Sequence, residues 1–200
     1  GGVALNCVAN GVLLREKIFE NIWIQPAAGD AGGALGAALA AWHIELNKER
    51  YNSVNRDEMK GSYLGPSYNS EEIENSLNNL GAVFHKLNKE TLVEGVAKAL
   101  SEEKAVGWMQ GRMEFGPRAL GGRSIIADPR SELMQKQLNL KVKYRESFRP
   151  FAPSILREHL SEWFDHNEDS PYMLLVADVK ESKRRLMNDA EKALFGIEKL

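Results

Sequence analysis

Residues 105–127 read AVGWMQGRMEFGPRALGGRSIIA: an apolar run, a loop rich in glycine and arginine, and a second apolar run. Short β-prone runs on either side of a glycine-rich segment are typical of two strands joined by a loop. The sequence therefore predicts strands at 105–109 and 124–127, with a loop between them that can fold closely around an anion.

Apolar periodicity and end signals predict the other elements, working outward from these strands. The predicted helices occupy residues 5–16, 31–47, 70–80, 89–102, 131–140 and 157–164. Further strands are predicted at residues 19–25, 82–85, 151–156 and 172–177. Ser70 is the predicted N-cap of one helix, and His159 is expected in the core on the inner face of another. Alternating strands and helices predict an α/β or α+β fold.

The helix predicted at 31–47 begins with a run of alanine and glycine. Interior glycines cost about 1 kcal/mol each relative to alanine, so a compensating interaction is needed. We therefore expect another backbone or a ligand to approach this helix closely.

Composition and charge limit the class of protein. Of the 200 residues, 43% are hydrophobic and 27% are charged, and the formal net charge is −2. This charge argues against nucleic-acid binding or a polybasic membrane anchor as the main activity. The single cysteine, Cys7, excludes a disulfide within the chain. Because no signal peptide opens the sequence and no apolar run is long enough to span a bilayer, we expect a cytoplasmic protein.

The first residues, Gly1-Gly2-Val3-Ala4-Leu5-Asn6, form a turn motif that should follow a strand, and there is no initial Met. We therefore expect a C-terminal piece of a longer protein whose N-terminal domain is absent. A shift to Asn, Ser, Gly and Pro predicts a linker at 51–67, which separates a unit at 1–50 from a second unit at 68–200.

The region from Arg112 to Arg149 carries nine Lys and Arg against four acids, a charge of +5 that leaves −7 for the rest of the chain. Opposite charges within one chain favour a focused anion site. Arginine pairs with phosphate through a planar fork of donors and keeps its charge. The candidate catalytic residues, which would stabilise charge, are Arg118, Arg123 and Arg149. The candidate phosphate-binding residues are Arg112, Ser124, Lys141, Lys143 and Arg145.

Four of these cations recur at spacings of two or four residues: Lys141, Lys143, Arg145 and Arg149. If their segment is extended, alternate side chains point to the same side. We therefore expect a row of cations that faces Arg118 and Arg123. A solvated basic surface and a nucleic-acid patch are the other interpretations of this region.

A second glycine-rich segment, Gly29-Asp30-Ala31-Gly32-Gly33, lies between a predicted strand and a predicted helix. Glycines at a helix N-terminus let a ligand approach unpaired backbone N–H groups. Asp30 would repel phosphate unless a cation lies between them, so it is a candidate metal ligand. The other interpretation is that Asp30 is the N-cap of the alanine-rich helix.

Several motifs appear in one order along the chain: Gly1-Gly2-Val3-Ala4-Leu5-Asn6, Gln25-Pro26-Ala27-Ala28-Gly29-Asp30, Gly36-Ala37-Ala38, Leu64-Gly65-Pro66, Glu114-Phe115-Gly116-Pro117-Arg118-Ala119-Leu120-Gly121 and Phe148-Arg149-Pro150-Phe151-Ala152-Pro153. Together they resemble the C-terminal portion of the nodulation- and antibiotic-type O-carbamoyltransferases (the NodU/CmcH type). The resemblance extends to about Ala177.

The resemblance implies two functional parts. Residues 1–50 would be the remnant of a carbamoyl-transfer lobe of the actin-like ATPase (ASKHA) superfamily, which binds iron and nucleotide. Residues 68–200 would be a YrdC-like domain that makes carbamoyl-adenylate from carbamoyl phosphate and ATP, with Mg²⁺ accompanying the ATP. The carbamoyl group then passes to a small hydroxyl-bearing acceptor.

Within this resemblance, Asp30 matches the metal-binding aspartate, and Gly1, Gly2 and Asn6 match the nucleotide-side turn. Gly29 is a further nucleotide-binding candidate. The Fe²⁺ site of the full-length enzyme also needs histidines from the N-terminal region. We therefore expect neither bound iron nor transferase activity in this chain alone. Two other interpretations stay open: a non-catalytic nucleotide- or anion-binding module, and a component of threonylcarbamoyl-type tRNA modification.

Overall fold

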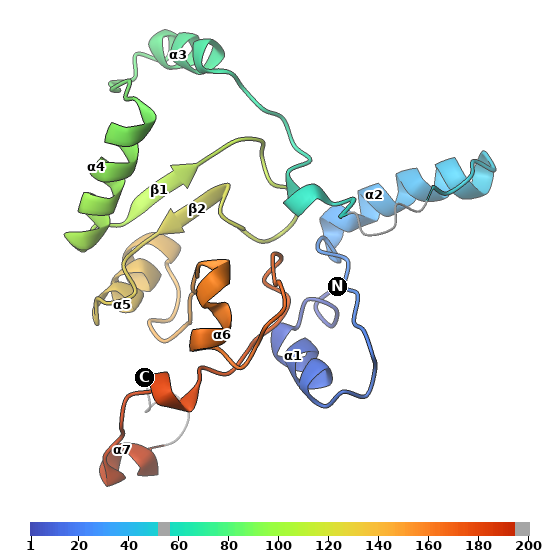
Figure 1. The fold of residues 1–200 in the computed structure, drawn as a ribbon. Helices are drawn as coiled ribbons and strands as arrows, with labels where there is room; N and C mark the ends of the chain where they lie inside the picture. The colour runs from blue at the N-terminus through green and yellow to red at the C-terminus, as the bar shows by residue number, and fades with distance from the viewer. Residues whose placement is uncertain (52–56, 195–200) are drawn as a thin grey trace. The chain divides into compact units, whose positions relative to one another are not determined.

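The computed structural model describes residues 1–51 and 57–194 as a set of helices with one small sheet (Figure 1). The α-helices are α1 (Cys7–Arg15), α2 (Asp30–Ala40), α3 (Ser70–Asn79), α4 (Lys89–Ser101), α5 (Met134–Leu138), α6 (Leu160–Trp163) and α7 (Asp189–Ala193). Strands β1 (Val106–Met109) and β2 (Arg123–Ile126) pair to form the sheet. Short π-helical and 3₁₀ turns are η1 (Ala41–Glu45), η2 (Lys60–Ser62), η3 (Asn139–Lys143), η4 (Arg157–His159) and η5 (Glu181–Lys183). This mixture of helix and strand agrees with the α/β prediction.

The chain folds into two compact units that interleave along the sequence. The first contains the described residues of 1–86 together with 107–124 and 170–176. The second contains 87–106, 125–169 and the described residues from 177 onward. Segments distant in sequence therefore complete the first unit.

Helix α1 anchors the late segment 170–176 within the first unit. The Asn10 side-chain amide donates to the carbonyls of Ala4, at 2.9 Å, and Leu174, at 3.1 Å. Arg15 donates to the Val176 carbonyl at 3.2 Å. Because side chains of α1 satisfy these carbonyls, residues 172–177 need no neighbouring strand, and the strand predicted there is absent.

A turn at Asp57 fixes the segment that precedes α3. The Asp57 carboxylate accepts hydrogen bonds from the backbone N–H groups of Met59, at 3.0 Å, and Gly61, at 2.9 Å. The Tyr172 hydroxyl also donates to Asp57, and it accepts from the Gly61 N–H at 3.0 Å. Burial and the hydrogen bond to Asp57 raise the pKa of Tyr172 to about 12. Burial raises the pKa of Asp57, but the hydrogen bonds from Tyr172 and the turn amides outweigh it, so this pKa is lowered.

The predicted helix at 31–47 forms as α2 and continues into η1. A Cβ atom on Gly32 would lie 2.0 Å from the Ala27 carbonyl oxygen, so only glycine fits there. The expected close approach is therefore found at Gly32, where the backbone of the preceding turn approaches the helix, whereas a Cβ atom on Gly33 or Gly36 would meet open space. None of the helix's residues is buried.

The second unit packs around α5. Met134 and Leu138 are buried on this helix, and Asn139 directly after it is fully buried. Helix α4 begins after Asn88, whose side chain accepts from the Thr91 N–H at 2.8 Å. None of the described helices is both long and apolar enough to cross a membrane.

Several local predictions are wrong. No strand forms at 19–25, 82–85 or 151–156, because an apolar run becomes a strand only where a partner strand pairs with it. Asn69, not Ser70, caps α3, in a reciprocal capping box with Glu72. His159 is exposed and lies 3.2 Å from the Glu162 carboxylate, outside any core.

The predicted linker falls partly outside the described residues, since 52–56 are not described. The rest of it, from Asp57, belongs to the first compact unit. The assignment of 1–50 and 68–200 to two separate family domains stays a prediction, and residues 195–200 of the second also lie outside the description.

Candidate active site

The loop between the two strands, residues 111–124, is called the arginine loop below. Its centre is Glu114, whose side chain is 0% exposed. One carboxylate oxygen accepts hydrogen bonds from the backbone N–H groups of Leu120, at 3.0 Å, and Gly122, at 2.8 Å. The other oxygen lies 3.4 Å from Nε of Arg123. Two amides and one guanidinium thus compensate the burial of this charge.

Arg123 is engaged inside the loop. Its Nη2 donates to the Gly116 carbonyl at 2.8 Å, and its Nε faces Glu114. Gly116 has φ +121°, a backbone conformation that favours glycine. The guanidinium of Arg123 therefore closes the loop and neutralises the buried acid.

Arg118 is bound differently. Its Nη2 donates to the Leu5 carbonyl at 2.9 Å, and its Nε is buried without a hydrogen-bond partner. The side chain is partly buried, and no carboxylate of the described residues forms an ion pair with it. A partly desolvated cation with no counter-charge is costly for a folded protein unless an anion binds beside it.

Two glycine turns lie next to the arginine loop. The Leu5 N–H donates to the Gly1 carbonyl at 3.1 Å, and the Gly1 backbone nitrogen donates to the Ala28 carbonyl. A Cβ atom on Gly116 would lie 3.5 Å from Cβ of Ala27. The structure therefore gathers residues 1–6, residues 25–30 and the arginine loop into one group, which we call the turn cluster.

The residues predicted to bind the nucleotide lie in this cluster, although some of their atoms already form hydrogen bonds within the protein. Asn6 caps α1 by accepting from the Ala9 N–H at 3.1 Å. Gly29 occupies the N-cap position of α2, and Asp30 is its first residue. The alternative that Asp30 is the N-cap is thus wrong, because no side chain caps this helix. The exposed Asp30 carboxylate still lies in the first turn, where the helix dipole favours negative charge.

The implied iron does not fit the described residues on their own. No three His, Cys, Asp or Glu side chains come together anywhere in 1–51 or 57–194. Asp30 would supply one oxygen ligand, and iron held by protein side chains needs several.

Residues 139–149, called the lysine turn below, do not form the predicted extended row. Residues Asn139–Lys143 are π-helical, and Tyr144 has φ +50°. Successive side chains in a helical turn fan out around its axis, so Lys141 and Lys143 do not share one side as they would in a strand. Both lysines are exposed, and neither forms an ion pair in the part of the chain that the structure describes.

Asn139 organises the lysine turn. Its amide nitrogen donates to the carbonyls of Ser147, at 3.0 Å, and Arg149, at 2.8 Å, and its oxygen accepts from Arg145 Nε at 2.6 Å. The guanidinium of Arg145 also lies 4.8 Å from the centroid of the Phe151 ring. Arg149 pairs with Glu146 at 2.7 Å, where hydrogen bonds within Glu146 and from Arg149 lower the pKa of the Glu146 carboxyl. Arg145 and Arg149 are thus both engaged locally.

The remaining candidates belong to the arginine loop. Arg112 is exposed, and Ser124 accepts a hydrogen bond from the Gly121 N–H at 3.0 Å. The arginine loop and the lysine turn belong to different compact units. The predicted convergence of their cations on one ligand stays a prediction.

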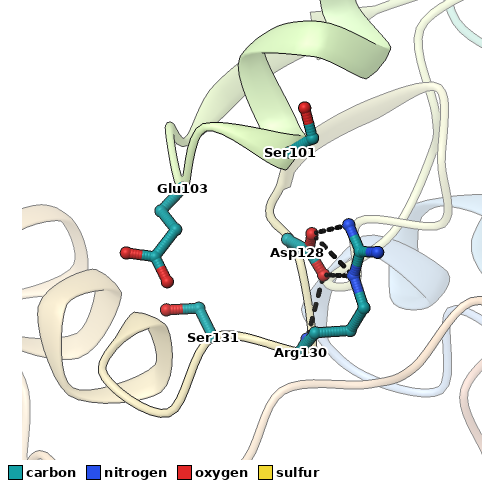
Figure 2. Close-up of a pocket in the computed structure, with 5 residues that line it drawn as sticks. All are labelled: Ser101, Glu103, Asp128, Arg130 and Ser131. Carbon is teal, nitrogen blue, oxygen red and sulfur yellow. Dashed lines mark hydrogen bonds and ion pairs between the residues drawn. The ribbon is translucent and has the colours of Figure 1, made fainter.

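A polar pocket of about 360 Å³ lies in the second unit, lined by Ser101, Glu103, Asp128, Arg130 and Ser131 (Figure 2). Asp128 and Arg130 form a bidentate ion pair across its rim, with hydrogen bonds of 2.9 and 3.0 Å to Nε. The hydrogen bonds from Arg130 lower the pKa of Asp128 to about 2. Because these charges neutralise each other and no predicted residue lines the pocket, it is not our candidate site.

Two organising residues, Glu114 and Asn139, were not predicted from the sequence. Glu114 is the one acid in residues 111–124, between glycines and arginines. An isolated acid in a basic loop is a usable signal for a buried counter-charge. Asn139 carries no comparable signal, because asparagine at a helix end is common.

Family models match both parts of the chain. Residues 1–39 match the model for the carbamoyltransferase N-terminus, and residues 97–192 match the model for the carbamoyltransferase C-terminus. The turn cluster therefore joins residues from the two matched regions, since Leu5 belongs to the first and Arg118 to the second.

Curated relatives agree with this match. The protein sll1178 of Synechocystis sp. strain PCC 6803 is 60% identical over 203 aligned residues, which cover 100% of this chain and 33% of the relative. Nodulation protein NolNO of Sinorhizobium fredii is 44% identical, over 94% of this chain and 27% of its own length. Nodulation protein NolO of Bradyrhizobium diazoefficiens is 41% identical, over 94% and 34%. The chain spans about a third of the length of these relatives. With both family models and these relatives aligned along it, the chain belongs to the carbamoyltransferase family.

Proposed function

We propose that this chain carries the phosphate-handling part of an O-carbamoyltransferase. In this proposal ATP with Mg²⁺ and carbamoyl phosphate are the substrates, carbamoyl-adenylate is the activated intermediate, and a small hydroxyl-bearing molecule accepts the carbamoyl group. The observation that supports it most is Arg118, a partly buried guanidinium with a single carbonyl partner and no carboxylate partner among the described residues.

The chemistry suits such a cation. Water must first release inorganic phosphate from carbamoyl phosphate, and an oxygen of the resulting carbamate then attacks the α-phosphorus of ATP and displaces pyrophosphate. Negative charge therefore builds up on phosphoryl oxygens in the transition state. A guanidinium that is held in place before the reaction stabilises that charge without reorganising. One N–H group of Arg118 already donates to the Leu5 carbonyl, which fixes the position of the guanidinium. Other N–H groups of the guanidinium are left to bind phosphate.

The backbone of the turn cluster complements Arg118. The N-terminus of α2 at Gly29 presents N–H groups and the positive end of a helix dipole. In the proposal these groups and the turn at Gly1 and Gly2 receive the nucleotide. The exposed Arg112 and the cations of the lysine turn bind further phosphate groups, including that of carbamoyl phosphate.

The wider architecture is part of the same proposal. Residues 1–50 belong to an actin-like ATPase (ASKHA) lobe, and residues 68–200 to a YrdC-like domain. Fe²⁺ would use Asp30 with ligands from outside the described residues, because those residues do not form a metal-binding group. The acceptor is likewise bound with help from other parts of the protein.

Calorimetry of the 200-residue chain with MgATP, and separately with carbamoyl phosphate, tests the proposal. Arg118→Ala should weaken MgATP binding by about 1.5–3 kcal/mol, the usual contribution of a hydrogen bond to a charged group. The matched control is Arg130→Ala, which removes an exposed guanidinium that is paired with Asp128. MgATP binding that is the same in the wild type and in Arg118→Ala would contradict the proposal.

Turnover separates this proposal from a module that only binds. An adenylate-forming chain releases pyrophosphate from ATP only when carbamoyl phosphate is present, whereas a binding module shows affinity and no release. Salt-sensitive tRNA binding would instead favour a role in threonylcarbamoyl-type modification.

A further inference from the structure

The arginine loop contains a buried acid that the proposed function does not use. Glu114 is inaccessible, so it cannot touch a phosphate ligand, and its charge would repel one. We infer that Glu114 and Arg123 are positioning residues that hold Arg118 in place for its phosphate ligand. This inference rests on the proposed function.

Side chains of Glu114 and Arg123 connect the beginning of the arginine loop to its end. Glu114 binds the N–H groups of Leu120 and Gly122, at the far end of the loop. Arg123 reaches back to the carbonyl of Gly116, near its beginning. Arg118 lies between these two attachments in sequence, so the closed backbone sets where its side chain begins.

Backbone hydrogen bonds hold both ends of the arginine loop, on either side of the span from Gly116 to Gly121. The Gly65 N–H donates to the Met113 carbonyl and the Met113 N–H to the Pro66 carbonyl, both at 2.9 Å. The Phe115 N–H donates to the Ser62 carbonyl at 2.7 Å. Backbone bonds thus hold the start of the loop, and the Gln110 N–H bond to the Gly122 carbonyl, at 2.8 Å, holds its end. The span from Gly116 to Gly121 is held by side chains of the loop itself: Glu114 and Arg123, and Ser124, which accepts from the Gly121 N–H at 3.0 Å.

Glu114 also sets which arginine of the loop carries an unpaired charge. Glu114 neutralises Arg123 within the loop. Of the two partly buried arginines in the arginine loop, only Arg118 then keeps an uncompensated charge. The ion pair of Glu114 and Arg123 therefore leaves Arg118 as the one unpaired cation of the two within the turn cluster. Two unpaired arginines this close would repel each other.

A mutant cycle in MgATP binding tests this inference, with Glu114→Ala, Arg118→Ala and the double variant. Glu114→Ala alone should weaken binding about tenfold to a hundredfold, the effect of a small displacement of a positioned group. In the Arg118→Ala background the same change should weaken binding less than about twofold, because the group that Glu114 positions is gone. Equal loss in both backgrounds, or no loss in either, would overturn the inference.

Two further measurements keep the test decisive. Glu114→Gln retains an oxygen acceptor for Leu120 and Gly122, so it should recover part of the affinity; it replaces Glu114→Ala throughout the cycle if the latter does not fold. The control Glu132→Gln removes an exposed acid and should leave the affinity unchanged.

Amide hydrogen exchange distinguishes failure of the inference from failure of the proposed function. If the wild-type chain does not bind MgATP, the proposed function fails. Faster exchange at Leu120 and Gly122 in Glu114→Ala than in the wild type would then still support the closure, and unchanged exchange would reject it.

Discussion

The arginine loop and the lysine turn are both basic, and each is built around one buried polar side chain. In the arginine loop that side chain is the carboxylate of Glu114, and in the lysine turn it is the amide of Asn139. Both bind backbone groups of the surrounding loop. The difference is charge, because a carboxylate neutralises a neighbouring arginine and an amide does not.

This difference decides where positive charge remains. In the arginine loop Glu114 compensates Arg123, and the uncompensated charge is the partly buried Arg118. In the lysine turn Lys141 and Lys143 remain exposed to solvent. One partly buried cation with a fixed partner suits a transition state, whereas exposed lysines suit the attraction of anions over a distance. Counting charges along the sequence does not separate these two cases.

The largest effect should follow the removal of the buried acid. Glu114→Ala leaves Arg123 and two amides without their partner, which should lower the free energy of unfolding by about 3–5 kcal/mol. Glu146→Ala is the matched change in the lysine turn, where the ion pair is exposed and half of each side chain is accessible. It should have no measurable effect. Urea denaturation of both variants checks the contrast, and similar losses would contradict it.

A smaller loss is expected for the buried amide. Asn139→Ala leaves the carbonyls of Ser147 and Arg149 without a donor, so the free energy of unfolding should fall by about 1–3 kcal/mol. The control is Asn79→Ala, an exposed asparagine at the end of α3. If the arginine loop alone fixes the ordered cation, Asn139→Ala should also leave the Arg118-dependent part of MgATP binding unchanged. A complete loss of that part would break the distinction between the two regions.

The smallest effect concerns the turn at Asp57 and Tyr172, which supports the arginine loop because the Gly61 N–H binds Tyr172 and the adjacent Ser62 carbonyl accepts from the Phe115 N–H. The raised pKa of Tyr172 means that the folded state holds this proton more tightly than the unfolded state. The associated stability is present below the unfolded value of 10.0 and is lost as the pH rises from there through about 12. The lowered pKa of Asp57 acts in the opposite direction: its stability is present above 3.8 and is lost as the pH falls further.

Tyr172→Phe is the matched variant for this pH dependence. The wild type should lose more free energy of unfolding than the variant between pH 10 and 12, and also below pH 3.8. Urea titrations across both ranges measure the difference. Parallel curves for the two proteins would show that the hydroxyl does not support the loop.

Local signals predicted the helices and the two paired strands. The helix at 70–80 was recognisable from a capping signal, which the structure moves from Ser70 to Asn69, and the helix at 89–102 from its apolar face, because these signals lie within a few residues. The same reasoning failed at 172–177. That segment has strand-like composition, but its carbonyls bind Asn10 and Arg15 more than 150 residues earlier, and no local pattern encodes such a partner.

The candidate site shows the same limit. Glycine and arginine content singled out residues 111–124, because those residue types are what a phosphate site needs. Which partner each arginine binds depends on contacts that the local sequence does not reveal. Arg118 binds Leu5, 113 residues earlier, and Arg123 is neutralised by an acid that sequence reasoning treated as one of four scattered negative charges. Sequence therefore located the loop, and three-dimensional contacts distinguish its arginines.

The late segment 170–176 has a consequence for synthesis on the ribosome. It supplies the carbonyls that α1 holds, so the first compact unit remains incomplete after residue 86 until residue 176 has been translated, about 90 residues later. At 5–20 residues per second this delay lasts roughly 5 to 20 s. During that interval the nascent chain presents the glycine turns and α1 without their final packing partner.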